Sequence, residues 1–329
     1  MQKEFLNLIQ KEFPISKRPF EDIAKILKSS EEEILNLYKK LKEEKIIRQT
    51  SAIFDTKSLG YRSSLVAFRL ENIDECAKFI NTHPGVSHNY ERNHEFNLWF
   101  TLAVPPNSKL GLEKTIELMA KVVKAKEYII LPTKKMFKIS VQLDIKGNKA
   151  KKEKLKAQKR VEIELKPIHY ELIKLLQEDI KPMKEPFKKV VETLNIDYDF
   201  LKQETDLLKQ AGYMRRFASI LYHRRAGFQA NAMVVWNIPE ENVEKIGQKV
   251  AEYSAVSHCY QRPTYPNWPY SLFSMIHGRS KNEVENIVQE ISKEIGINEY
   301  KYLYSTKEFK KIRVKYFSDE FEKWEKTYG

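Results

Sequence analysis

The chain has 329 residues, of which 42% are hydrophobic and 31% charged, and its formal net charge is +13. This length is too great for one compact core and indicates two or more domains of a soluble globular protein. No apolar membrane span or signal-peptide core is visible, and the two cysteines, Cys76 and Cys259, form neither a disulfide framework nor a zinc site. We therefore expect a cytoplasmic protein rather than an exported one.

The first sixty residues show helical periodicity. Phe5 begins one apolar stripe, Pro19 begins a second short helix, and Ser30 begins a capping box ahead of a third helix. A strand then opens at residues 46–48. Three short helices followed by a two-stranded wing are typical of a winged helix-turn-helix, which we predict over residues 1–60.

After the wing, the period changes from helical to alternating. The predicted order is βαββαβ, with strands at 65–70, 86–92, 96–104 and 128–131, and helices at 73–82 and 110–123. A further strand is expected near 136–143. This order predicts a ferredoxin-like domain over residues 61–145, in which helices cover one face of an antiparallel sheet.

A strongly basic segment follows this domain. KGNKAKKEKLKAQKR, from Lys146 to Arg160, has eight basic residues and one acidic residue, so it carries +7 of the net charge. It has few apolar residues and no period, which indicates a solvated connector rather than a DNA-binding arm. We predict a basic linker over residues 146–167, and the net charge is therefore a weak argument for nucleic-acid binding.

The chain repeats itself after this linker. Gly60 matches Gly227 at an offset of 167 residues, and the offset grows to 174 beyond a proline-rich insert at 263–269. Two copies at this spacing are duplicated domains, because solenoid repeats are several times shorter. We expect an α+β fold in tandem duplication, with a second winged helix-turn-helix at 168–227 and a second ferredoxin-like domain at 228–329. A tail strand is expected near 309–317, as one was near 136–143 in the first half. The two halves are called copy one and copy two.

Two short strings are the most distinctive part of the repeat. They are SHNYER, from Ser87 to Arg92, and SHCYQR, from Ser257 to Arg262. Alternation along a strand would place three side chains of each string on one face, namely His88, Tyr90 and Arg92, and His258, Tyr260 and Arg262. A histidine that exchanges a proton near neutral pH, beside a guanidinium that binds carboxylates, suits an acidic ligand. A half-exposed strand with a polar outer face is the alternative interpretation, and the duplication favours the site.

Longer strings carry a family resemblance. They are RPF near Arg18, GYRSSLVA from Gly60, VSHNYERNHEFNLWF from Val86, RRFASILYHRRAGFQANAMVVW from Arg215 and VSHCYQRPTYPNWPYSLFSMIHG from Val256. Together they resemble the two subunits of siroheme decarboxylase, a family with an Lrp/AsnC-like fold, fused in one polypeptide. The resemblance covers nearly the whole chain apart from the linker. The chain departs from the two-subunit pattern in its fusion and at Ser271, where the match to Asn97 leads us to expect asparagine.

The resemblance implies an enzyme that removes carbon dioxide from two acetate side chains of siroheme and gives 12,18-didecarboxysiroheme. The product would feed the alternative heme pathway or the pathway to the modified heme of nitrite reductases. A DNA-binding regulator of the Lrp/AsnC type and a heme-binding sensor are the alternatives. The recognition helix expected in copy two presents nearly as many acids as bases, which is unfavourable for phosphate contacts.

The resemblance also bears on cofactors and partners. No cofactor or metal site is expected beyond the iron that the substrate carries, since no glycine-rich phosphate loop or metal cluster appears in the sequence. We expect siroheme as the ligand, no membrane partner and no specific DNA site. The two halves are expected to pair within the chain, and a further homodimer is left open.

The implied chemistry needs a proton donor, because loss of carbon dioxide leaves carbanion character on a methylene. The candidate donors are His223, His258, His88 and His94, and the more complete predicted site is that of copy two, with His223 and His258. The predicted substrate-binding residues are Arg215, Arg216, Arg224, Arg225, Arg262, Tyr260, Arg92, Tyr90 and Trp268. A solvated wing for the arginines and ordinary core packing for the aromatics are the alternatives. His83, His169 and His277 are interpreted as structural.

Overall fold

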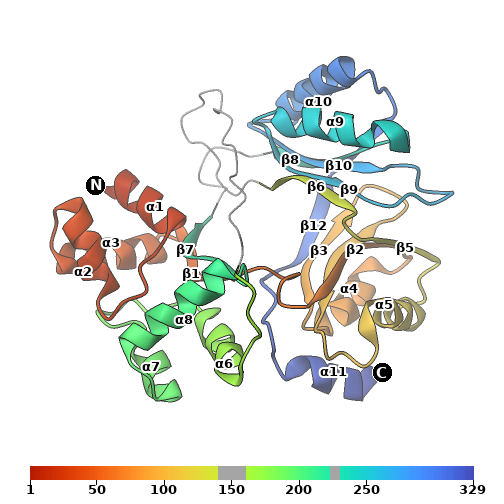
Figure 1. Cartoon of the computed structure of the whole chain (residues 1–329). Helices are drawn as coiled ribbons and strands as arrows, with labels where there is room; N and C mark the ends of the chain where they lie inside the picture. The colour runs from red at the N-terminus through yellow and green to blue at the C-terminus, as the bar shows by residue number, and fades with distance from the viewer. Residues whose placement is uncertain (140–160, 223–229) are drawn as a thin grey trace. The chain divides into compact units, whose positions relative to one another are not determined.

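The computed structural model describes residues 1–139, 161–222 and 230–329 (Figure 1). They form two compact units, and each unit draws on both copies of the repeat. Unit 1 contains residues 1–61, 161–222 and 315–319, and unit 2 contains residues 62–139, 230–314 and 320–329. The basic run from Lys146 to Arg160 lies outside the described residues. The bounds predicted above for the two winged helix-turn-helix segments, the basic linker and the two ferredoxin-like domains stay predictions.

The helices of unit 1 follow the predicted order in both copies. They are α1 Gln2–Lys11, α2 Pro19–Leu27 and α3 Glu31–Glu43 in copy one, and α6 Pro167–Leu176, α7 Lys188–Leu194 and α8 Tyr198–Gln210 in copy two. At the start of α3, the Ser30 hydroxyl accepts from the Glu33 amide and the Glu33 carboxylate accepts from the Ser30 amide. This is the predicted capping box. Asp197 caps α8 by accepting from the Phe200 amide at 2.7 Å.

The wing differs from the expected two strands in each copy. Each copy contributes one strand, and β1 Ile47–Phe54 pairs antiparallel with β7 Met214–Leu221 in a two-stranded sheet. At its centre the hydroxyls of Thr50 and Ser219 lie 2.5 Å apart, and the Tyr38 hydroxyl donates to Thr50 at 2.8 Å. These polar atoms are buried and bond one another, so the shared sheet fixes the pairing of the two helix-turn-helix segments.

Unit 2 contains two five-stranded sheets, each with helices on one face (Figure 1). The copy-one sheet has the order β12-β3-β4-β2-β5, and the copy-two sheet has the order β11-β8-β10-β9-β6. The strands are β2 Arg62–Arg69, β3 Val86–Arg92, β4 Leu98–Val104, β5 Glu127–Leu131, β6 Lys135–Ile139, β8 Ala230–Trp236, β9 Val256–Gln261, β10 Leu272–Gly278, β11 Tyr300–Leu303 and β12 Ser305–Lys311. The helices are α4 Ile73–Thr82, α5 Gly111–Val122, α9 Glu240–Glu252 and α10 Lys281–Ile295, with α11 Glu320–Tyr328 at the C-terminal end. The predicted βαββαβ order is confirmed in both copies.

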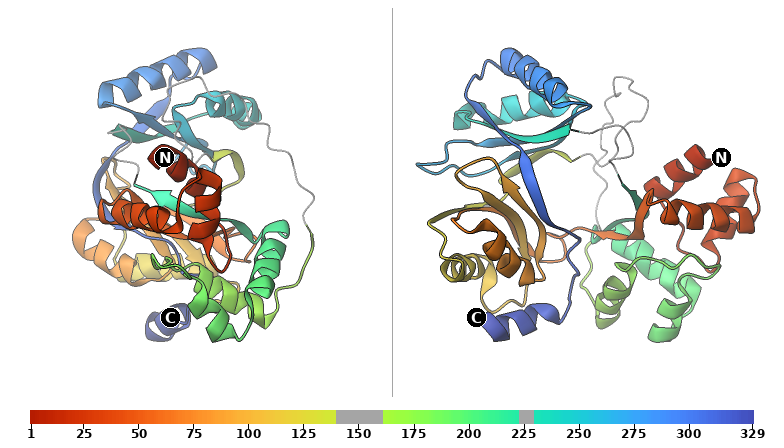
Figure 2. Two further views of the ribbon diagram at one scale, coloured as in Figure 1. Left: turned by 90° about the vertical axis from the view of Figure 1, so that its left-hand side faces the viewer. Right: turned by 180° about the vertical axis from the view of Figure 1, so that it is seen from behind.

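The last strand of each copy joins the sheet of the other copy. Strand β6 of copy one pairs with β9, and β12 of copy two pairs with β3. Figure 2 shows the blue strand β12 alongside the orange strands of the copy-one sheet. The sequence predicted a strand near each position, at 136–143 and 309–317, but not its partner. In the second case the strand begins earlier, at Ser305, and residues 320–328 form a helix that was not predicted.

The helix-free faces of the two sheets pack against each other. Their shared core includes Ala67 and Ile129 from the copy-one sheet, and Val235 and Phe273 from the copy-two sheet. Separate apolar cores lie between each sheet and its helices. Unit 2 is therefore layered as helices, sheet, sheet and helices, and a side chain on β3 or β9 points either to a helix layer or to the space between the sheets.

Candidate active site

The string from Ser257 to Arg262 lies along and just beyond β9, between β10 and the exchanged strand β6. Cys259 points to the helix layer, where its thiol lies 3.7 Å from the Gly247 carbonyl oxygen. The rings of His258 and Tyr260 lie on the other face, with centroids 6.0 Å apart, and the Arg262 guanidinium carbon is 5.2 Å from the Tyr260 ring centroid. The structure therefore brings together the predicted row of imidazole, phenol and guanidinium.

Copy one forms the same row on β3. The rings of His88 and Tyr90 are 6.3 Å apart, and the Arg92 guanidinium carbon is 5.7 Å from the Tyr90 ring centroid. The Ser87 hydroxyl lies 3.0 Å from the His88 Nδ1 atom. In their own residues the two rows are thus close to equivalent.

The neighbours of the two rows differ, because they come from the exchanged strands. On β6, Met136 lies opposite Tyr260 and Ile139 opposite His258. These two apolar side chains are 51% and 40% exposed. Directly opposed residues of antiparallel strands share a face, so an open apolar surface adjoins the copy-two row.

The corresponding positions beside the copy-one row are charged. On β12, Glu308 lies opposite Tyr90 and Lys311 opposite His88. Their charged groups are 4.0 Å apart and about half exposed, a weak surface ion pair. A flat apolar ligand would find a matching wall only beside the copy-two row. We call the surface formed by His258, Tyr260, Met136 and Ile139 the copy-two face.

The environment of His258 favours its neutral form. Burial lowers the pKa of its imidazole, because a charged ring loses hydration there. Its Nδ1 atom lies 2.8 Å from the Ser257 hydroxyl, so Nε2 is the nitrogen left to act on a ligand. A histidine that is half-buried and hydrogen-bonded through one nitrogen is suited to proton transfer through the other.

His94 has a local role in the turn between β3 and β4. Its Nδ1 atom accepts from the Phe96 amide at 3.1 Å, and its ring packs edge-on against Trp268 at 5.3 Å. Burial, together with the charge of Lys301, lowers the pKa of this imidazole. Its role as a proton donor stays a prediction, and the contacts seen here are those of a turn residue.

Arg92 and Arg262 each tie one sheet to the other. Arg92 Nη1 donates to the Leu303 carbonyl oxygen at 2.6 Å, and Arg262 Nη1 donates to the Leu131 carbonyl oxygen. Both carbonyls end the strand that precedes an exchanged strand. Burial lowers the pKa of both guanidinium groups to about 10, so they remain charged at neutral pH. Sequence reasoning missed these bonds, since they join residues of different copies.

Each of these arginines also has a buried N–H donor that no described residue accepts. The Nε atoms of both are buried and have no hydrogen-bond partner among the described residues. A buried donor without a partner costs free energy, and a ligand carboxylate would relieve that cost. Substrate binding by Arg92 and Arg262 stays a prediction, beside a structural role that the sequence did not indicate.

Trp268 is a core side chain rather than an open wall. It is fully buried, with its ring 5.3 Å from Trp99 and 5.0 Å from Tyr270. The proline-rich insert that carries it thus anchors between the two sheets. The sequence allowed two interpretations of this residue, a ligand contact and ordinary core packing. The observed burial fits core packing, because a side chain without exposed surface has no area with which to contact a ligand.

Two of the remaining predicted residues lie in unit 1. Arg215 and Arg216 lie on β7 in unit 1, where Arg215 Nη2 forms an ion pair with Asp55 at 2.7 Å. Burial lowers the pKa of Arg216. His223, Arg224 and Arg225 lie outside the described residues. Their roles stay predictions.

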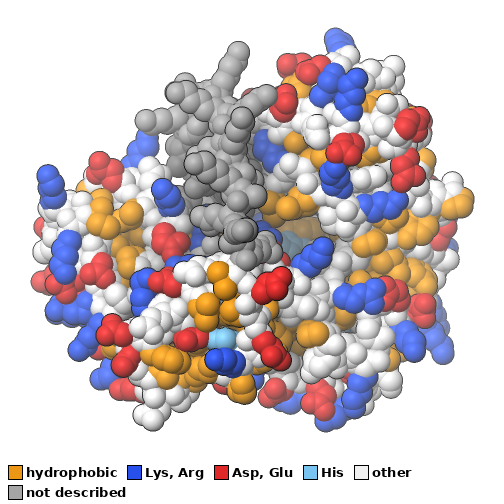
Figure 3. All heavy atoms as spheres, viewed as in Figure 1, with side chains coloured by type: hydrophobic (Ala, Val, Ile, Leu, Met, Phe, Trp, Pro, Cys, Tyr) orange, Lys and Arg blue, Asp and Glu red, His pale blue; other side chains and the backbone are white. Residues whose placement is uncertain are grey.

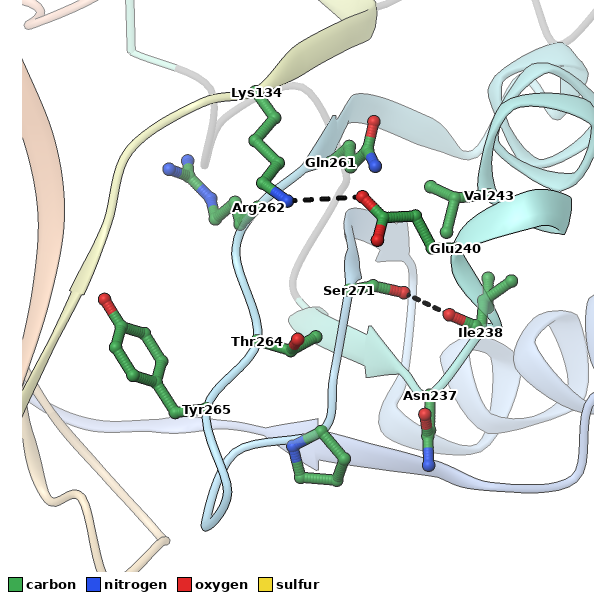
Figure 4. Close-up of a pocket in the computed structure, with 11 residues that line it drawn as sticks. Lys134, Asn237, Ile238, Glu240, Val243, Gln261, Arg262, Thr264, Tyr265 and Ser271 are labelled. Atoms are coloured by element: carbon green, nitrogen blue, oxygen red, sulfur yellow. Dashed lines mark hydrogen bonds and ion pairs between the residues drawn. The ribbon is translucent and has the colours of Figure 1, made fainter.

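The departure at Ser271 changes the local packing. In copy one, the Asn97 amide donates to the Leu70 carbonyl at 2.8 Å and accepts from the Leu70 amide at 3.0 Å. In copy two, the Ser271 hydroxyl donates to the Ile238 carbonyl at 2.7 Å. The shorter side chain borders a cavity of about 290 Å³ whose lining also includes Arg262 (Figure 4). Its volume lies at the lower end for ligand pockets, and polar groups dominate its lining.

Two lysines of the predicted recognition helices are paired within the chain. Lys42 of α3 forms an ion pair with Asp179, and Lys209 of α8 forms one with Glu12. Figure 3 shows Lys and Arg interspersed with Asp and Glu over the visible face. Phosphate contacts need a continuous positive face, and these helices do not provide one on the side shown.

Within residues 1–139, 161–222 and 230–329, no helix is long and apolar enough to cross a membrane. The same residues contain no group of three or more histidine, cysteine, aspartate or glutamate side chains placed to hold a metal ion.

Comparisons with known proteins agree with this geometry. A model of the siroheme decarboxylase NirDL-like HTH domain matches residues 2–48, and a model of the AsnC-like ligand binding domain matches residues 58–138 and 225–310. The chain is 41% identical over 323 residues to a siroheme decarboxylase of Hydrogenobacter thermophilus, which covers 98% of this chain and 96% of that protein.

Solved structures give the same result. The crystal structure of the siroheme decarboxylase NirDL is similar, with a TM-score of 0.80 and 36% identity over 99% of this chain and 97% of that chain. Its complex with an iron-uroporphyrin III analogue has a TM-score of 0.79 at 36% identity over 98% of this chain and 97% of that one. The chain therefore belongs to the siroheme decarboxylase family.

Proposed function

We propose that this chain decarboxylates siroheme, and that it does so at the copy-two face. The reaction removes carbon dioxide from two acetate side chains and gives 12,18-didecarboxysiroheme, which makes the chain a carboxy-lyase. We place the reaction at this face because His258 and Tyr260 lie opposite the exposed apolar side chains of Ile139 and Met136. The family membership carries the reaction.

The copy-two face suits a flat macrocycle with acidic edges. Met136 and Ile139 offer exposed apolar surface beside the phenol of Tyr260, and burying that surface against a ring favours binding by about 25 cal/mol per Å². The equivalent positions of copy one carry Glu308 and Lys311. There, an acetate group would meet a carboxylate of like charge, and the macrocycle would have to desolvate both charges.

The chemistry at this face is a proton transfer. When carbon dioxide leaves an acetate, the bonding electrons remain on the methylene carbon and delocalise into the ring. A proton must then reach that carbon, and we assign its delivery to His258 through Nε2. Arg262 remains charged and has a buried Nε without a partner among the described residues, which supports its predicted role in holding a carboxylate. Arg215 is already paired with Asp55, so we do not assign it a substrate carboxylate.

The regulator and the sensor are less well supported. Regulation would require a positive recognition face, and Lys42 and Lys209 are neutralised by Asp179 and Glu12. A sensor would bind the tetrapyrrole and leave its mass unchanged, and this outcome distinguishes it from an enzyme.

The test is anaerobic incubation of the purified chain with siroheme, followed by mass analysis of the tetrapyrrole. We expect the loss of two carbon dioxide units from each molecule. Recovery of siroheme of unchanged mass, bound in stoichiometric amount, would indicate the sensor and contradict the proposed function. Loss of a single unit would contradict the didecarboxylated product.

A further inference from the structure

Strand β9 contains an irregularity beside His258. His258 lies opposite Met275 on β10, but Val256 lies opposite Ile276, so Ser257 is an extra residue in the ladder. Such a bulge redirects a side chain. In a regular strand, Ser257 and His258 would point to opposite faces. Here the Ser257 hydroxyl lies 2.8 Å from the Nδ1 atom of its own neighbour.

The same hydroxyl contacts a second histidine. Ser257 Oγ lies 2.7 Å from Nε2 of His277 on β10, and 3.4 Å from the Met275 carbonyl oxygen. The two short contacts are strong hydrogen bonds, and the longer one is weak by comparison. A hydroxyl donates one proton and accepts another. Ser257 is 6% exposed, so water has little access to compete for these bonds.

We propose that His277 and Ser257 form a proton relay that delivers a proton to Nδ1 of His258 while Nε2 gives up its own during decarboxylation. This inference rests on the proposed function and extends it to two residues that do not touch the substrate. Ser257 and His277 are positioning residues: they set which nitrogen of His258 carries the proton before the reaction, and they supply the Nδ1 proton that keeps the ring neutral during it.

The proton movements balance in one concerted step. The carbon–carbon bond to the carboxylate breaks, carbon dioxide leaves, and the methylene carbon takes the Nε2 proton of His258. His258 Nδ1 takes the hydroxyl proton of Ser257, and Ser257 Oγ takes the Nε2 proton of His277. In the same step the Nδ1 atom of His277 takes a proton from solvent, so no imidazole is left as an anion. Before the next turnover, His258 Nε2 takes a proton from solvent, the three shifts reverse, and His277 Nδ1 releases its proton. Each carbon dioxide released therefore consumes one proton.

The surroundings of His258 make such a relay useful. Burial lowers the pKa of this imidazole, so the ring is mostly neutral near pH 7. A neutral imidazole that gave up its Nε2 proton without compensation would become an anion in a poorly hydrated place, which is costly. Receiving a proton at Nδ1 in the same step avoids that anion.

Copy one has the first half of the relay but lacks the second. The ladder shifts in the same way at Ser87, whose hydroxyl lies 3.0 Å from His88 Nδ1. The residue that matches His277 is Ala103, and the two make equivalent backbone bonds: His277 donates to the Ala255 carbonyl and Ala103 donates to the Gly85 carbonyl, both at 3.0 Å. In copy one the chain of bonds therefore has no histidine at its far end.

The test uses single turnovers of the full chain with siroheme saturating. We expect Ser257→Ala and His277→Gln each to slow carbon dioxide loss roughly tenfold to hundredfold, below the 10² to 10⁴ typical of losing the acid itself. The affinity for siroheme, measured by absorbance titration, should stay within about twofold because neither residue touches the substrate. Ser257→Thr keeps the hydroxyl and should restore most of the rate.

Ser274→Ala is the matched control. Ser274 is a buried serine on β10 whose hydroxyl accepts from the Trp236 indole at 2.9 Å and donates to the Val234 carbonyl at 3.4 Å. This variant loses the same group at similar burial and should decarboxylate at the parental rate. The solvent deuterium effect provides a second readout: several protons in motion give a curved dependence on deuterium content for the parent, and Ser257→Ala should make it linear.

The outcomes separate the relay from the function. Parental rates in both Ser257→Ala and His277→Gln would overturn the relay while leaving decarboxylation intact. Equal slowing by Ser257→Ala, Ser257→Thr and Ser274→Ala would also overturn it, because the loss would then follow packing. Absence of turnover in the parental chain would instead overturn the proposed function.

Discussion

Copy one and copy two have nearly the same row of side chains, but the residues beside each row differ. His88 and Tyr90 share their face with Glu308 and Lys311 of β12. His258 and Tyr260 share theirs with Met136 and Ile139 of β6. In each case the neighbours belong to the other copy. A duplicated site can therefore diverge without changes in its own string, because the strand that completes it evolves in the opposite half of the chain.

The difference in exposed surface is our reason for proposing that the ligand binds at the copy-two face. Charged side chains are well solvated on an open strand, so Glu308 and Lys311 need no further partner. Met136 and Ile139, at 51% and 40% exposed, leave apolar area in water beside a histidine and a phenol. Adjoining exposed apolar side chains of this kind mark binding surfaces more often than isolated ones do.

Removing each of the two equivalent histidines distinguishes the two faces most directly. We expect His258→Ala to slow decarboxylation by about 10² to 10⁴ in single turnovers, as loss of a general acid does, with siroheme binding largely intact. His88→Ala should have a smaller effect, of at most a few-fold. A larger loss for His88→Ala than for His258→Ala would move the chemistry to the copy-one face.

A second experiment exchanges the neighbours rather than the histidines. The double variant Met136→Glu with Ile139→Lys gives copy two the charges of copy one. We expect siroheme affinity to fall roughly 30-fold, because about 2 kcal/mol of apolar contact is lost. The reciprocal variant, Glu308→Met with Lys311→Ile, changes the same residue types on the copy-one face and should leave the parental affinity within a few-fold. Similar losses in both variants would show that the two faces bind alike.

Local signals in the sequence predicted local structure. The capping box at Ser30 and the βαββαβ order are readable because each depends on residues a few positions apart. The row on β9 was likewise predicted from period-two alternation. The bulge at Ser257 was not, since it is defined by the register with β10 and leaves the letters of β9 unchanged.

Features that join the two copies were beyond sequence reasoning. The bonds from Arg92 to Leu303 and from Arg262 to Leu131 link residues of different copies. The sequence around each arginine contains no signal that predicts its partner. The same holds for the apolar neighbours on β6. A repeat does predict that two halves can pair, but the choice between a strand joining its own sheet and joining the other sheet depends on tertiary packing.

The smallest predicted effect concerns the corner between helix and strand in each copy, where His83 of copy one matches Tyr253 of copy two. His83 is 1% exposed, accepts from the Gly85 amide through Nδ1 at 2.9 Å, and packs 4.5 Å from Trp324 of α11. Burial, with the charge of Lys310 nearby, lowers the pKa of His83 to about 3. Tyr253 instead bonds Glu294 at the surface.

Because folding lowers the pKa of His83, the folded chain loses stability relative to the unfolded chain as the pH falls. The unfolded chain binds a proton at His83 below about pH 6.5, whereas the folded chain resists it until about pH 3. The stabilisation from neutral His83 is thus complete above pH 6.5 and falls by about 1.4 kcal/mol per pH unit between pH 6.5 and pH 3. A side chain that cannot titrate at this position would not show that loss.

We therefore expect His83→Gln to be less stable than the parent at pH 7 and to gain on it as the pH falls, with the difference in melting temperature narrowing or reversing by about pH 5. Tyr253→Phe is the control from copy two. It removes a hydrogen bond at the equivalent corner without removing a histidine, so its difference from the parent should stay nearly constant between pH 7 and pH 5. A constant difference for His83→Gln over the same range would mean that His83 takes up a proton in the folded chain as readily as in the unfolded one, and that the two corners do not differ in their response to acid.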